Sequence, residues 1–469
     1  MYRGCRSYGA IFYLIIFMLL LGSITTTKAQ QYTITDLGTL GGEVSIAYRI
    51  SNFGEVVGYS LTNGEDYNTR RAFLYKDGVM LNLGTLGGST SCAHGINNLG
   101  QVVGESDTAL NPDDYQAFLY TGGNLGMLYS FSGHSMAADI NDKGQAVGHQ
   151  VQVFGRAFLY DNGFSTDLGT LGGETSLAAA INNAGQVVGE STISSYGEGH
   201  AFLYSDGVMQ DLGTLGGTPP YPGSSASSAR DINDLGEIVG SALTIDGASH
   251  AFLHRGGSMI DLGTLGGTQS GAYGINNYGE VVGHSQRGPD NSYYAFLYRK
   301  GSMIDLNNLL TAGSGWDYDG LSAAFGINDK GQIVGWGRIS GQSHAFLLTP
   351  IPIQVTINIR PEGDANRINL RSNGKIAVAI ISTPDFDAPS QVDQGSLTFG
   401  ATGDEQSLIS CKRRPKDVHH DGFADDLVCR FYIQSAGFKC GDTEGILKGL
   451  TKDGKLIEGR DFVNIVKCK

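Results

Sequence analysis

The sequence predicts an all-β protein: a seven-bladed β-propeller of four-stranded blades, closed by the N-terminal strand, followed by a C-terminal β-sandwich. Three observations support this fold class. A seven-residue motif recurs along most of the chain, each repeat carries two tight-turn signatures between short apolar runs, and the repeats begin and end out of phase. Glycine is also abundant, with 70 of 469 residues, as expected for a chain with many turns.

The recurring motif is Asp-Leu-Gly-Thr-Leu-Gly-Gly. Five clear copies and two degenerate ones recur every ~42 to 50 residues, a period that is typical of blade-type repeats. The copies begin at Asp36, Asn82, Asn124, Asp167, Asp211, Asp261 and Asp305.

Each repeat reads as four strands, here called A to D. Strands A and B flank a turn of the form Ile-Asn-Asx-x-Gly, followed by two apolar residues and Gly, as in Ile96 to Gly104. Asn at the first position and Gly at the fourth are typical of a type I turn, so we interpret the Asn as a turn residue; the alternative is a repeated ligand set. Strand C is a continuous apolar run such as Ala72 to Tyr75, which fits a strand covered on both faces. A hairpin turn such as Asp77-Gly78 then leads into strand D.

The phase of the repeats predicts a closed ring. The chain opens with a D strand at Tyr32 to Leu37, and the last repeat ends after its C strand at His344 to Leu348. The first strand is therefore expected to complete the last blade, which also protects the edge strands from pairing with other chains. The alternative is an open β-solenoid, which would gain nothing from this offset.

The N-terminus predicts export. Arg3 and Arg6 precede an apolar run at Ile11 to Leu21, and Thr27-Lys28-Ala29 offers a cleavage site, so residues 1–29 are predicted to be a signal peptide. The alternative is an uncleaved membrane anchor, although the run is shorter than the ~20 residues of a spanning helix. We expect a secreted, periplasmic or cell-surface protein with no transmembrane segment in the mature chain.

Charge divides the chain into two parts. The net charge is −14, and residues 30–352 hold 13 Lys and Arg against 30 Asp and Glu, whereas residues 353–469 hold 16 of each. The acidic part disfavours a nucleic-acid partner, because phosphate binding needs a basic face. The composition changes near Pro350-Ile351-Pro352, so we place a propeller at 30–350 and a second domain at 351–469.

The motifs resemble a known group. His-Ala-Phe, Asp-Leu-Gly-Thr-Leu-Gly-Gly and Ile-Asn-x-x-Gly-x-Val-Val-Gly, in fixed order over residues 31–348, are similar to those of the HAF-repeat extracellular proteins of bacteria. His stands before Ala-Phe at His200, His250 and His344 but is replaced in the other four repeats. The resemblance implies secretion and a repeat architecture, and it supplies no catalytic residues.

Variable loops are the predicted ligand-binding region. The A–B and C–D turns are short and nearly constant and lie at one end of the ring, whereas the B–C and D–A connections at the other end vary, as binding loops on rigid scaffolds do. These loops carry tyrosines beside carboxylates, a combination that can bind glycans; solvated loop residues are the alternative. The candidates are Tyr67, Tyr115, Tyr196, Tyr221 and Tyr293.

No catalytic constellation stands out. The ten His residues lack a metal-ligand spacing, and no Ser or Cys lies in a nucleophile elbow. We therefore predict a monomeric, non-enzymatic binding or adhesion protein for glycans or surface polymers. The alternatives are a polysaccharide hydrolase or lyase with its site in the channel, and a structural envelope protein. Clustered carboxylates at a deep pocket would favour a glycosidase.

The C-terminal part predicts a β-sandwich of about seven strands. The predicted strands are Val355–Ile359, Ile376–Ile381, Ser396–Phe399, Leu408–Cys411, Leu427–Ile433, Leu447–Leu450 and Phe462–Val466, and Pro384 to Gln394 is predicted to be a loop. It resembles a small sandwich module found in many secreted bacterial proteins, at Ile359-Arg360-Pro361, Ile380 to Asp387 and Cys440 to Glu444.

An acidic loop at Asp417 to Asp426 is similar to a calcium loop. Calcium prefers oxygen ligands from alternating positions, and His419 and His420 replace residues that the pattern fills with Asp, Asn or Gly. The alternative is an acidic hairpin loop without a metal. The candidate ligands are Asp417, Asp421, Asp425 and Asp426.

Four cysteines lie in this domain, and export predicts that they form disulfides in one of three connectivities. We favour Cys411–Cys429 across the hairpin that carries the acidic loop, and Cys440–Cys468 at the C-terminus. Cys92, in an A strand, is predicted to be buried and unpaired.

Overall fold

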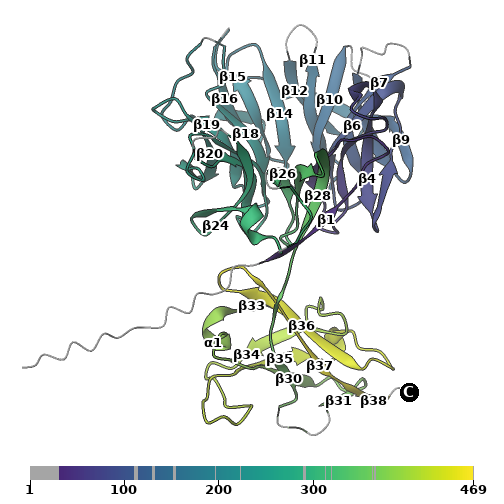
Figure 1. Ribbon diagram of the computed structural model, residues 1–469, viewed down its shortest axis with the longest axis vertical. Coiled ribbons are helices and arrows are strands. Elements are labelled where there is room, and N and C mark those ends of the chain that lie inside the picture. The colour runs from purple at the N-terminus through teal and green to yellow at the C-terminus, as the bar shows by residue number, and fades with distance from the viewer. Residues whose placement is uncertain are drawn as a thin grey trace, which may run out of the picture.

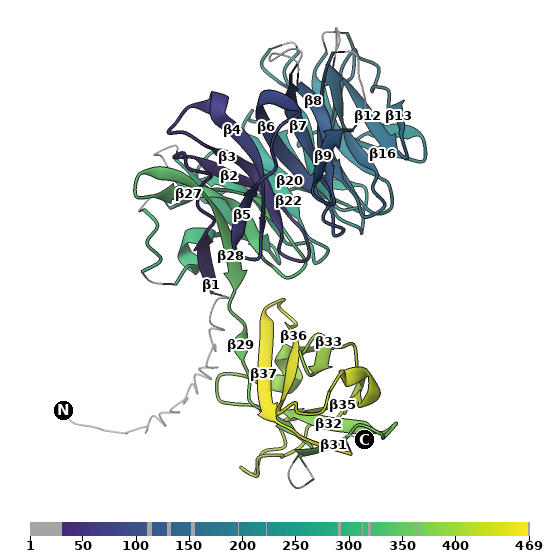
Figure 2. The same ribbon diagram turned by 90° about the vertical axis from the view of Figure 1, so that its right-hand side faces the viewer.

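The computed structural model describes residues 31–109, 115–128, 133–151, 155–195, 197–221, 223–288, 292–311, 313–317, 320–361, 363 and 366–467. The predicted signal peptide lies outside these residues. The described chain forms an upper body of repeated sheets and a lower body that contains the C-terminal residues (Figures 1 and 2). None of the helices in these ranges has the length and hydropathy that a membrane span requires.

Residues 32–350 form seven four-stranded antiparallel sheets, which confirms an all-β, propeller-like architecture. The first three sheets contain β2 (Ser45–Ile50), β3 (Val56–Leu61), β4 (Arg70–Lys76) and β5 (Val79–Asn82); β6 (Gly87–Ile96), β7 (Val102–Thr108), β8 (Tyr115–Thr121) and β9 (Asn124–Met127); and β10 (His134–Ile140), β11 (Ala146–Val151), β12 (Gly155–Asp161) and β13 (Phe164–Asp167). The next three contain β14 (Ser176–Ile181), β15 (Val187–Thr192), β16 (Gly199–Ser205) and β17 (Val208–Asp211); β18 (Ser227–Ile232), β19 (Ile238–Leu243), β20 (Ser249–Arg255) and β21 (Ser258–Asp261); and β22 (Ser270–Ile275), β23 (Val281–Gln286), β24 (Tyr293–Arg299) and β25 (Ser302–Asp305). The last contains β26 (Leu321–Ile327), β27 (Ile333–Ile339), β28 (Gln342–Pro350) and β1 (Tyr32–Asp36), and the short helices η1 (Tyr67–Thr69) and η2 (Leu306–Leu309) lie in connections.

The predicted closure by the first strand is confirmed. β1 pairs antiparallel with β28, with Tyr32 opposite Pro350 and Asp36 opposite Phe346. The His344 Nδ1 atom lies 2.9 Å from the Asp36 carboxylate. His200 and Asp211, and His250 and Asp261, repeat this contact. The His of the His-Ala-Phe motif thus holds the Asp that begins the seven-residue motif, and it does so across strands C and D.

The apolar runs are buried because neighbouring sheets cover each other. One core cluster combines Val57 and Leu74 of the first sheet with Val102 and Phe118 of the second. A buried serine at the start of strand A links the sheets as well: Ser91 Oγ accepts from the Ala72 amide at 2.9 Å and donates to a carbonyl of the preceding loop. Ser45 makes the same bond with the Ala345 amide of the last sheet, which joins the two ends of the array.

The C-terminal domain is a sandwich of two four-stranded sheets. One contains β29 (Ile353–Gln354), β37 (Leu456–Phe462), β36 (Glu444–Thr451) and β33 (Val392–Gly400); the other contains β30 (Ile357–Ile359), β32 (Lys375–Ile380), β35 (Leu427–Tyr432) and β34 (Leu408–Cys411). β31 (Arg367–Asn369) pairs with β38 (Asn464–Val466), and α1 (Ala388–Gln391) and η4 (Gln434–Ala436) are short helices. Both sheets contribute to one core cluster that includes Val378, Leu427, Phe399 and Leu447.

The predicted Cys411–Cys429 disulfide is present, between residues that face each other on β34 and β35. Cys440 is also disulfide-bonded, but its predicted partner Cys468 lies outside the described residues. Cys92 is buried and free, as predicted.

The C-terminal domain contacts the end of the array that carries the short turns. Arg299 Nη1 donates to the Gly454 carbonyl at 3.3 Å and pairs with Glu280 at 3.2 Å, and Lys300 Nζ donates to the Lys452 carbonyl. The variable-loop end of the array therefore faces away from this contact.

Candidate functional site

Two hollows lie along the axis of the sheet array, and Arg49 lies between them. Its guanidinium donates to the carbonyl oxygens of Tyr273 and Phe325 at 3.1 and 3.2 Å and lies 3.5 Å from the Asp231 carboxylate. Burial raises the pKa of Asp231, against the opposing effect of Arg49, and raises that of nearby Asp139 to about 6. Both hollows are lined in part by Arg49, which lies between them.

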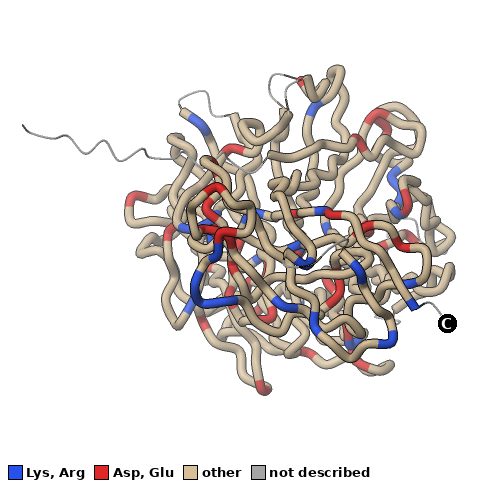
Figure 3. Tube along the Cα trace, turned by 90° about the horizontal axis from the view of Figure 1, so that it is seen from below, with Lys and Arg blue, Asp and Glu red and all other residues tan. Residues whose placement is uncertain are grey.

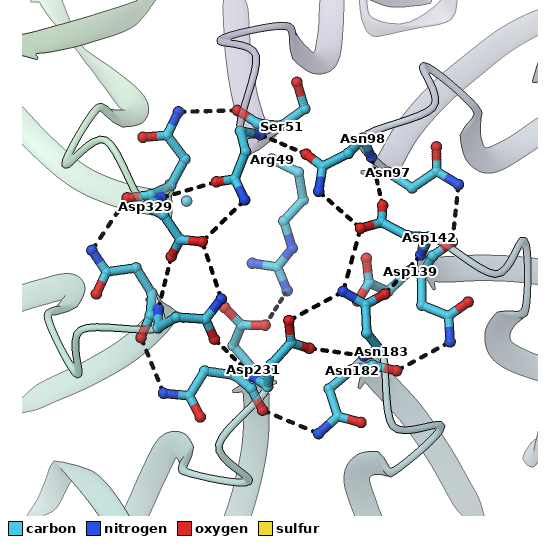
Figure 4. Close-up of a pocket in the computed structure, with 18 of the residues that line it drawn as sticks. Arg49, Ser51, Asn97, Asn98, Asp139, Asp142, Asn182, Asn183, Asp231 and Asp329 are labelled. Carbon is cyan, nitrogen blue, oxygen red and sulfur yellow. Dashed lines mark hydrogen bonds and ion pairs between the residues drawn. The ribbon is translucent and has the colours of Figure 1, made fainter. Parts of the chain in front are cut away.

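The hollow at the turn end is surrounded by a closed ring of hydrogen bonds, drawn in Figure 4 with Arg49 in its middle. In each A–B turn, the backbone amide of one residue donates to the side chain of its counterpart in the next sheet, as from Asn98 to Asp142 at 2.8 Å. The last bond runs from the Asp329 amide to Asn52, 3.0 Å away, and joins the last sheet to the first. We call this set the turn-end ring: Asn52, Asn98, Asp142, Asn183, Asp234, Asn277 and Asp329.

The Asn that precedes the turn makes a second set of links. Asn97 Nδ2 donates to the Asn141 carbonyl of the next sheet at 2.9 Å, and Asn328 Nδ2 donates to the Ser51 carbonyl at 3.0 Å. Ser51 stands where the other repeats have Asn, so the corresponding side-chain link from the first sheet to the second is missing. The Asn97 side-chain oxygen accepts from the Leu99 and Gln101 amides of its own turn, as the turn interpretation requires. The repeated Asn residues also hold sheets together, so their polar atoms are already used.

The hollow at the other end owes its lining to a repeated β-bulge. In every A strand the pairing register shifts at the same place, as between Ala47 and Arg49, so one residue per sheet is extra. A bulge redirects a side chain, and here it turns the extra residue toward the axis. These seven residues all line one pocket, which we call the loop-end pocket: Tyr48, His94, Ala138, Ala179, Arg230, Tyr273 and Phe325.

The glycine after the apolar pair makes this bulge possible. A Cβ atom at Gly148 would lie 1.9 Å from the Met136 carbonyl oxygen, and one at Gly58 would lie 1.9 Å from that of Ile46. No side chain fits there, so the Val-Val-Gly motif is explained by the close approach of strand A. The equivalent glycines meet the same carbonyl in every sheet: Gly58, Gly104, Gly148, Gly189, Gly240, Gly283 and Gly335.

The loop-end pocket has a volume of about 290 Å³ and an aromatic wall. The Phe325 ring lies 5.4 Å from Tyr48 and 4.9 Å from Tyr273 between centroids. Arg230 and Glu190 add charge to this wall. The pocket thus combines flat apolar surfaces with a few polar groups, a composition that is typical of small-ligand sites.

Three imidazoles lie in or beside the loop-end pocket: His94 and His149 line it, and His284 packs against the lining residue Tyr273. Burial, and then the nearby Arg230 charge, lowers the pKa of His284 to about 4, and burial also lowers the pKa of His149. Burial works against a charge on His94, but Cys92 and the Glu105 carboxylate raise its pKa above the ordinary value. His94 Nε2 lies 3.9 Å from the Glu105 carboxylate, whereas His149 Nδ1 is buried and has no hydrogen-bond partner among the described residues. The wall of the pocket therefore contains one buried polar atom that the described protein does not satisfy.

The predicted loop tyrosines lie outside the lining of this pocket. Tyr67 on η1 and Tyr221 are exposed, and Tyr196 lies outside the described residues. Tyr115 stacks on His134 with centroids 4.7 Å apart. The structure does not bring Tyr67, Tyr115 and Tyr221 together.

Tyr293 is the predicted tyrosine that is linked to a pocket residue, through the ring of His284. Its ring meets His284 edge to face at 4.7 Å, and His284 in turn lies 5.2 Å from Tyr273.

Sequence reasoning missed the strand residues that line the pocket, because the bulge that exposes them is not visible in a single strand. A signal was present: Tyr48 and its six equivalents vary, although the Ala before them and the Ile two residues after them are the same in all seven repeats.

In the acidic loop, His419 lies between two of the predicted calcium ligands. Its Nδ1 and Nε2 atoms are each 2.9 Å from a carboxylate, of Asp426 and Asp421 respectively. Asp426 is fully buried and also accepts from the amides of Ser382 and Val418. The loop still fits a cation in one respect, because buried oxygens of Asp417 and Asp425 have no hydrogen-bond partner.

No family model matches the chain, and no curated protein matches it either, so the HAF-repeat resemblance stays an expectation. Solved structures similar to it include a fungal alcohol oxidase of the AA5 family in complex with copper, with 11% identity over 93% of this chain and 99% of that chain and a TM-score of 0.44. An acylaminoacyl peptidase from Pyrococcus horikoshii has 12% identity over 55% of this chain and 44% of its own, with a TM-score of 0.38. The Aleuria aurantia lectin, in complex with a fucose-containing disaccharide, has 13% identity over 65% and 91%, with a TM-score of 0.31.

Proposed function

We propose that this chain is an exported, non-enzymatic binding protein, built on a seven-bladed propeller, that holds a sugar residue of a glycan or surface polymer in the loop-end pocket. The observation that carries the proposal is the lining of that pocket. The bulge in each blade turns a variable residue of the repeat toward the ligand, while the turn-end ring keeps the scaffold closed.

The chemistry of the lining favours a sugar. A pyranose ring has apolar C–H faces and a periphery of hydroxyl groups. Tyr48, Tyr273 and Phe325 offer flat apolar surfaces, and Arg230 offers hydrogen bonds to hydroxyls. The volume is near the lower end for ligand pockets, ~300 Å³, so we expect one terminal or flanking residue of the glycan to enter.

The position of the carboxylates supports binding over hydrolysis. Asp231 contacts Arg49 and accepts from the amides of Ile232 and Ile275, and Asp139 accepts from the Ile181 amide. These side chains serve the scaffold at the turn-end hollow. The one carboxylate in the described lining of the loop-end pocket is that of Glu190, which accepts from Ser225 Oγ. A hydrolase or lyase remains the alternative, and it predicts new reducing ends when a glycan that binds is incubated with the protein.

The test is a glycan-array screen of the mature protein, followed by Tyr273→Ala and its control Tyr278→Ala. Both tyrosines come from the same blade, but Tyr278 lies on the opposite, turn end, where it is exposed. We expect Tyr273→Ala to weaken binding by about tenfold or more, the effect of losing one aromatic contact of ~1.4 kcal/mol, and Tyr278→Ala to leave it unchanged. Equal effects of the two changes, or release of reducing ends, would contradict the proposal.

We also propose that the acidic loop binds calcium weakly, through Asp417, Asp421 and Asp425. The unpartnered buried oxygens of Asp417 and Asp425 support this, and the imidazole of His419 competes for the same carboxylates. Titration calorimetry with calcium tests it. His419→Asn supplies the oxygen ligand that the loop pattern expects and should bind calcium more tightly than the wild type; no heat with either protein would refute the site.

A further inference from the structure

The C-terminal domain carries a cavity of about 470 Å³ on the outer face of the sheet that contains β30, β32, β35 and β34. Its described lining is strongly basic, although the chain as a whole is acidic, and Asp417 is the one carboxylate in it. Figure 3 views the molecule from below, with the C-terminal domain toward the reader, and shows short runs of Lys and Arg on this side. The cations of this basic cavity are Arg360, Lys375, Lys412, Lys416 and Arg430.

The sheet places these cations. Along β32, Ile376 and Val378 point into the sandwich core and are buried, so Lys375 and Ala377 share the opposite face. Arg430 lies opposite Ala377 on β35 and belongs to the same face. The three exposed cations Arg360, Lys375 and Arg430 make no ion pair with a described carboxylate.

The backbone around the cavity is held firmly. The Arg360 amide donates to the Ala377 carbonyl at 2.8 Å, and the Lys412 amide donates to the Val428 carbonyl at 2.8 Å. The disulfide between Cys411 and Cys429 lies directly before Lys412 and Arg430 in the two strands. Charges on rigid strands lose less entropy on binding than charges on a mobile tail, so this set is prepared for an anion.

The floor of the cavity is apolar. Ala377, Val428 and Val418 belong to one small hydrophobic cluster and also line the cavity. A cationic rim over an apolar floor matches a sugar ring that carries a carboxylate or sulfate. Arg413 and Arg414 are exposed next to Lys412, so the positive charge extends beyond the cavity along the chain.

From this arrangement we propose that the basic cavity binds an acidic polysaccharide, with Lys375 and Arg430 contacting its carboxylate or sulfate groups. The site is separate from the loop-end pocket and does not depend on it. Residues 30–352 carry a net charge of −17, from 13 Lys and Arg against 30 Asp and Glu, and repel such a polymer. The polymer is therefore expected to meet the molecule at the C-terminal domain.

The experiment measures binding of the full mature chain to immobilised polygalacturonate, with neutral dextran as the reference surface, at two salt concentrations. We expect binding to polygalacturonate alone, weakening steeply as salt rises. The double variant Lys375→Gln/Arg430→Gln should lose about tenfold in affinity, and the matched control Lys439→Gln/Lys452→Gln, whose exposed lysines lie outside the cavity, should lose little.

Arg413→Gln/Arg414→Gln provides a second variant that leaves the sheet untouched, and we expect a smaller loss from it. Thermal unfolding of each variant checks that the fold is intact. Three results would overturn the proposal: no binding of the wild type at low salt, an equal loss in the control variant, or binding to phosphatidylglycerol vesicles but not to polygalacturonate. The glycan array on Tyr273→Ala reports on the other site, so failure of one proposal can be told from failure of the other.

Discussion

The hollow at the turn end and the pocket at the loop end lie on one axis, are separated by Arg49, and differ in how their polar groups are used. At the turn end, the Asn and Asp side chains of each sheet are bonded to the next sheet and all seven turns take part. At the loop end, the bulged residues differ from sheet to sheet, and His149 Nδ1 has no partner. In this protein the constant positions of the repeat hold the ring, and the variable bulged positions line the pocket.

The largest effect is expected from breaking the bulge that opens the pocket. Gly148→Ala would place a Cβ atom 1.9 Å from the Met136 carbonyl oxygen, and backbone cannot move that far without losing the sheet pairing. We expect a loss of more than about 4 kcal/mol in the free energy of unfolding, or no folded protein. Gly126→Ala is the control, because a Cβ there meets nothing within 4 Å and its φ is negative. Denaturant unfolding that shows similar stability for both would contradict our account of the Val-Val-Gly motif.

Breaking the turn end should reduce stability without changing the pocket. Asn328→Ala removes bonds from Nδ2 to the carbonyl of Ser51 and to Gln332, and leaves the amides of Lys330 and Gln332 without their acceptor. We expect unfolding to become easier by about 3 kcal/mol, since several buried polar groups lose partners. Binding to the glycan identified by the array should stay within error, and the exposed Asn63→Ala should affect neither quantity. A large loss of binding in folded Asn328→Ala would mean that the two ends are coupled.

Titration of a histidine at the loop end should make the free energy of unfolding fall in acid. The pKa of His284 is lowered to about 4 by burial and by Arg230, whereas an unfolded histidine titrates near ~6.5. Between these values the unfolded chain binds a proton that the folded chain does not, so stability falls as pH falls through this window. The loss from this residue should reach about 2 kcal/mol at pH 5. His284→Phe should show a correspondingly smaller drop between pH 7 and pH 5 in urea unfolding; an unchanged drop would refute this assignment.

The smallest effect, a gain in the free energy of unfolding, is expected at Ser51, where the other repeats have Asn. Ser51→Asn would give the first sheet the side-chain amide that the other sheets use, within the pattern that links Asn97 to Asn141. One added hydrogen bond to the Asn97 carbonyl should raise the free energy of unfolding by about 1 kcal/mol. A change of zero or a loss, measured by thermal unfolding, would show that this position is adapted to Ser51.

Much of the propeller-like part could be predicted because its information is local. Gly at a turn, Asn before it and a continuous apolar run between turns restrict the backbone residue by residue, and β1 was assigned to the last sheet from the phase of the repeats alone. The strands of the C-terminal domain were predicted less completely: β29, β31 and β37 were missed, and α1 lies within the predicted loop Pro384 to Gln394. These elements occur once, so no repeat was available to average out their weak patterns.

By itself, the sequence determined the strands and turns of the repeats and the closing pair, and it favoured the Cys411–Cys429 bridge, because each depends on neighbours in the chain or on a period that can be counted. The tertiary structure alone decided which side chains face the axis. One extra residue in each A strand turns Tyr48, Arg230 and their equivalents inward, and a shift of one residue reverses the face that a strand presents. It also decided that the repeated Asn residues bond between sheets, since their partners come from the next repeat and meet only when the ring has closed.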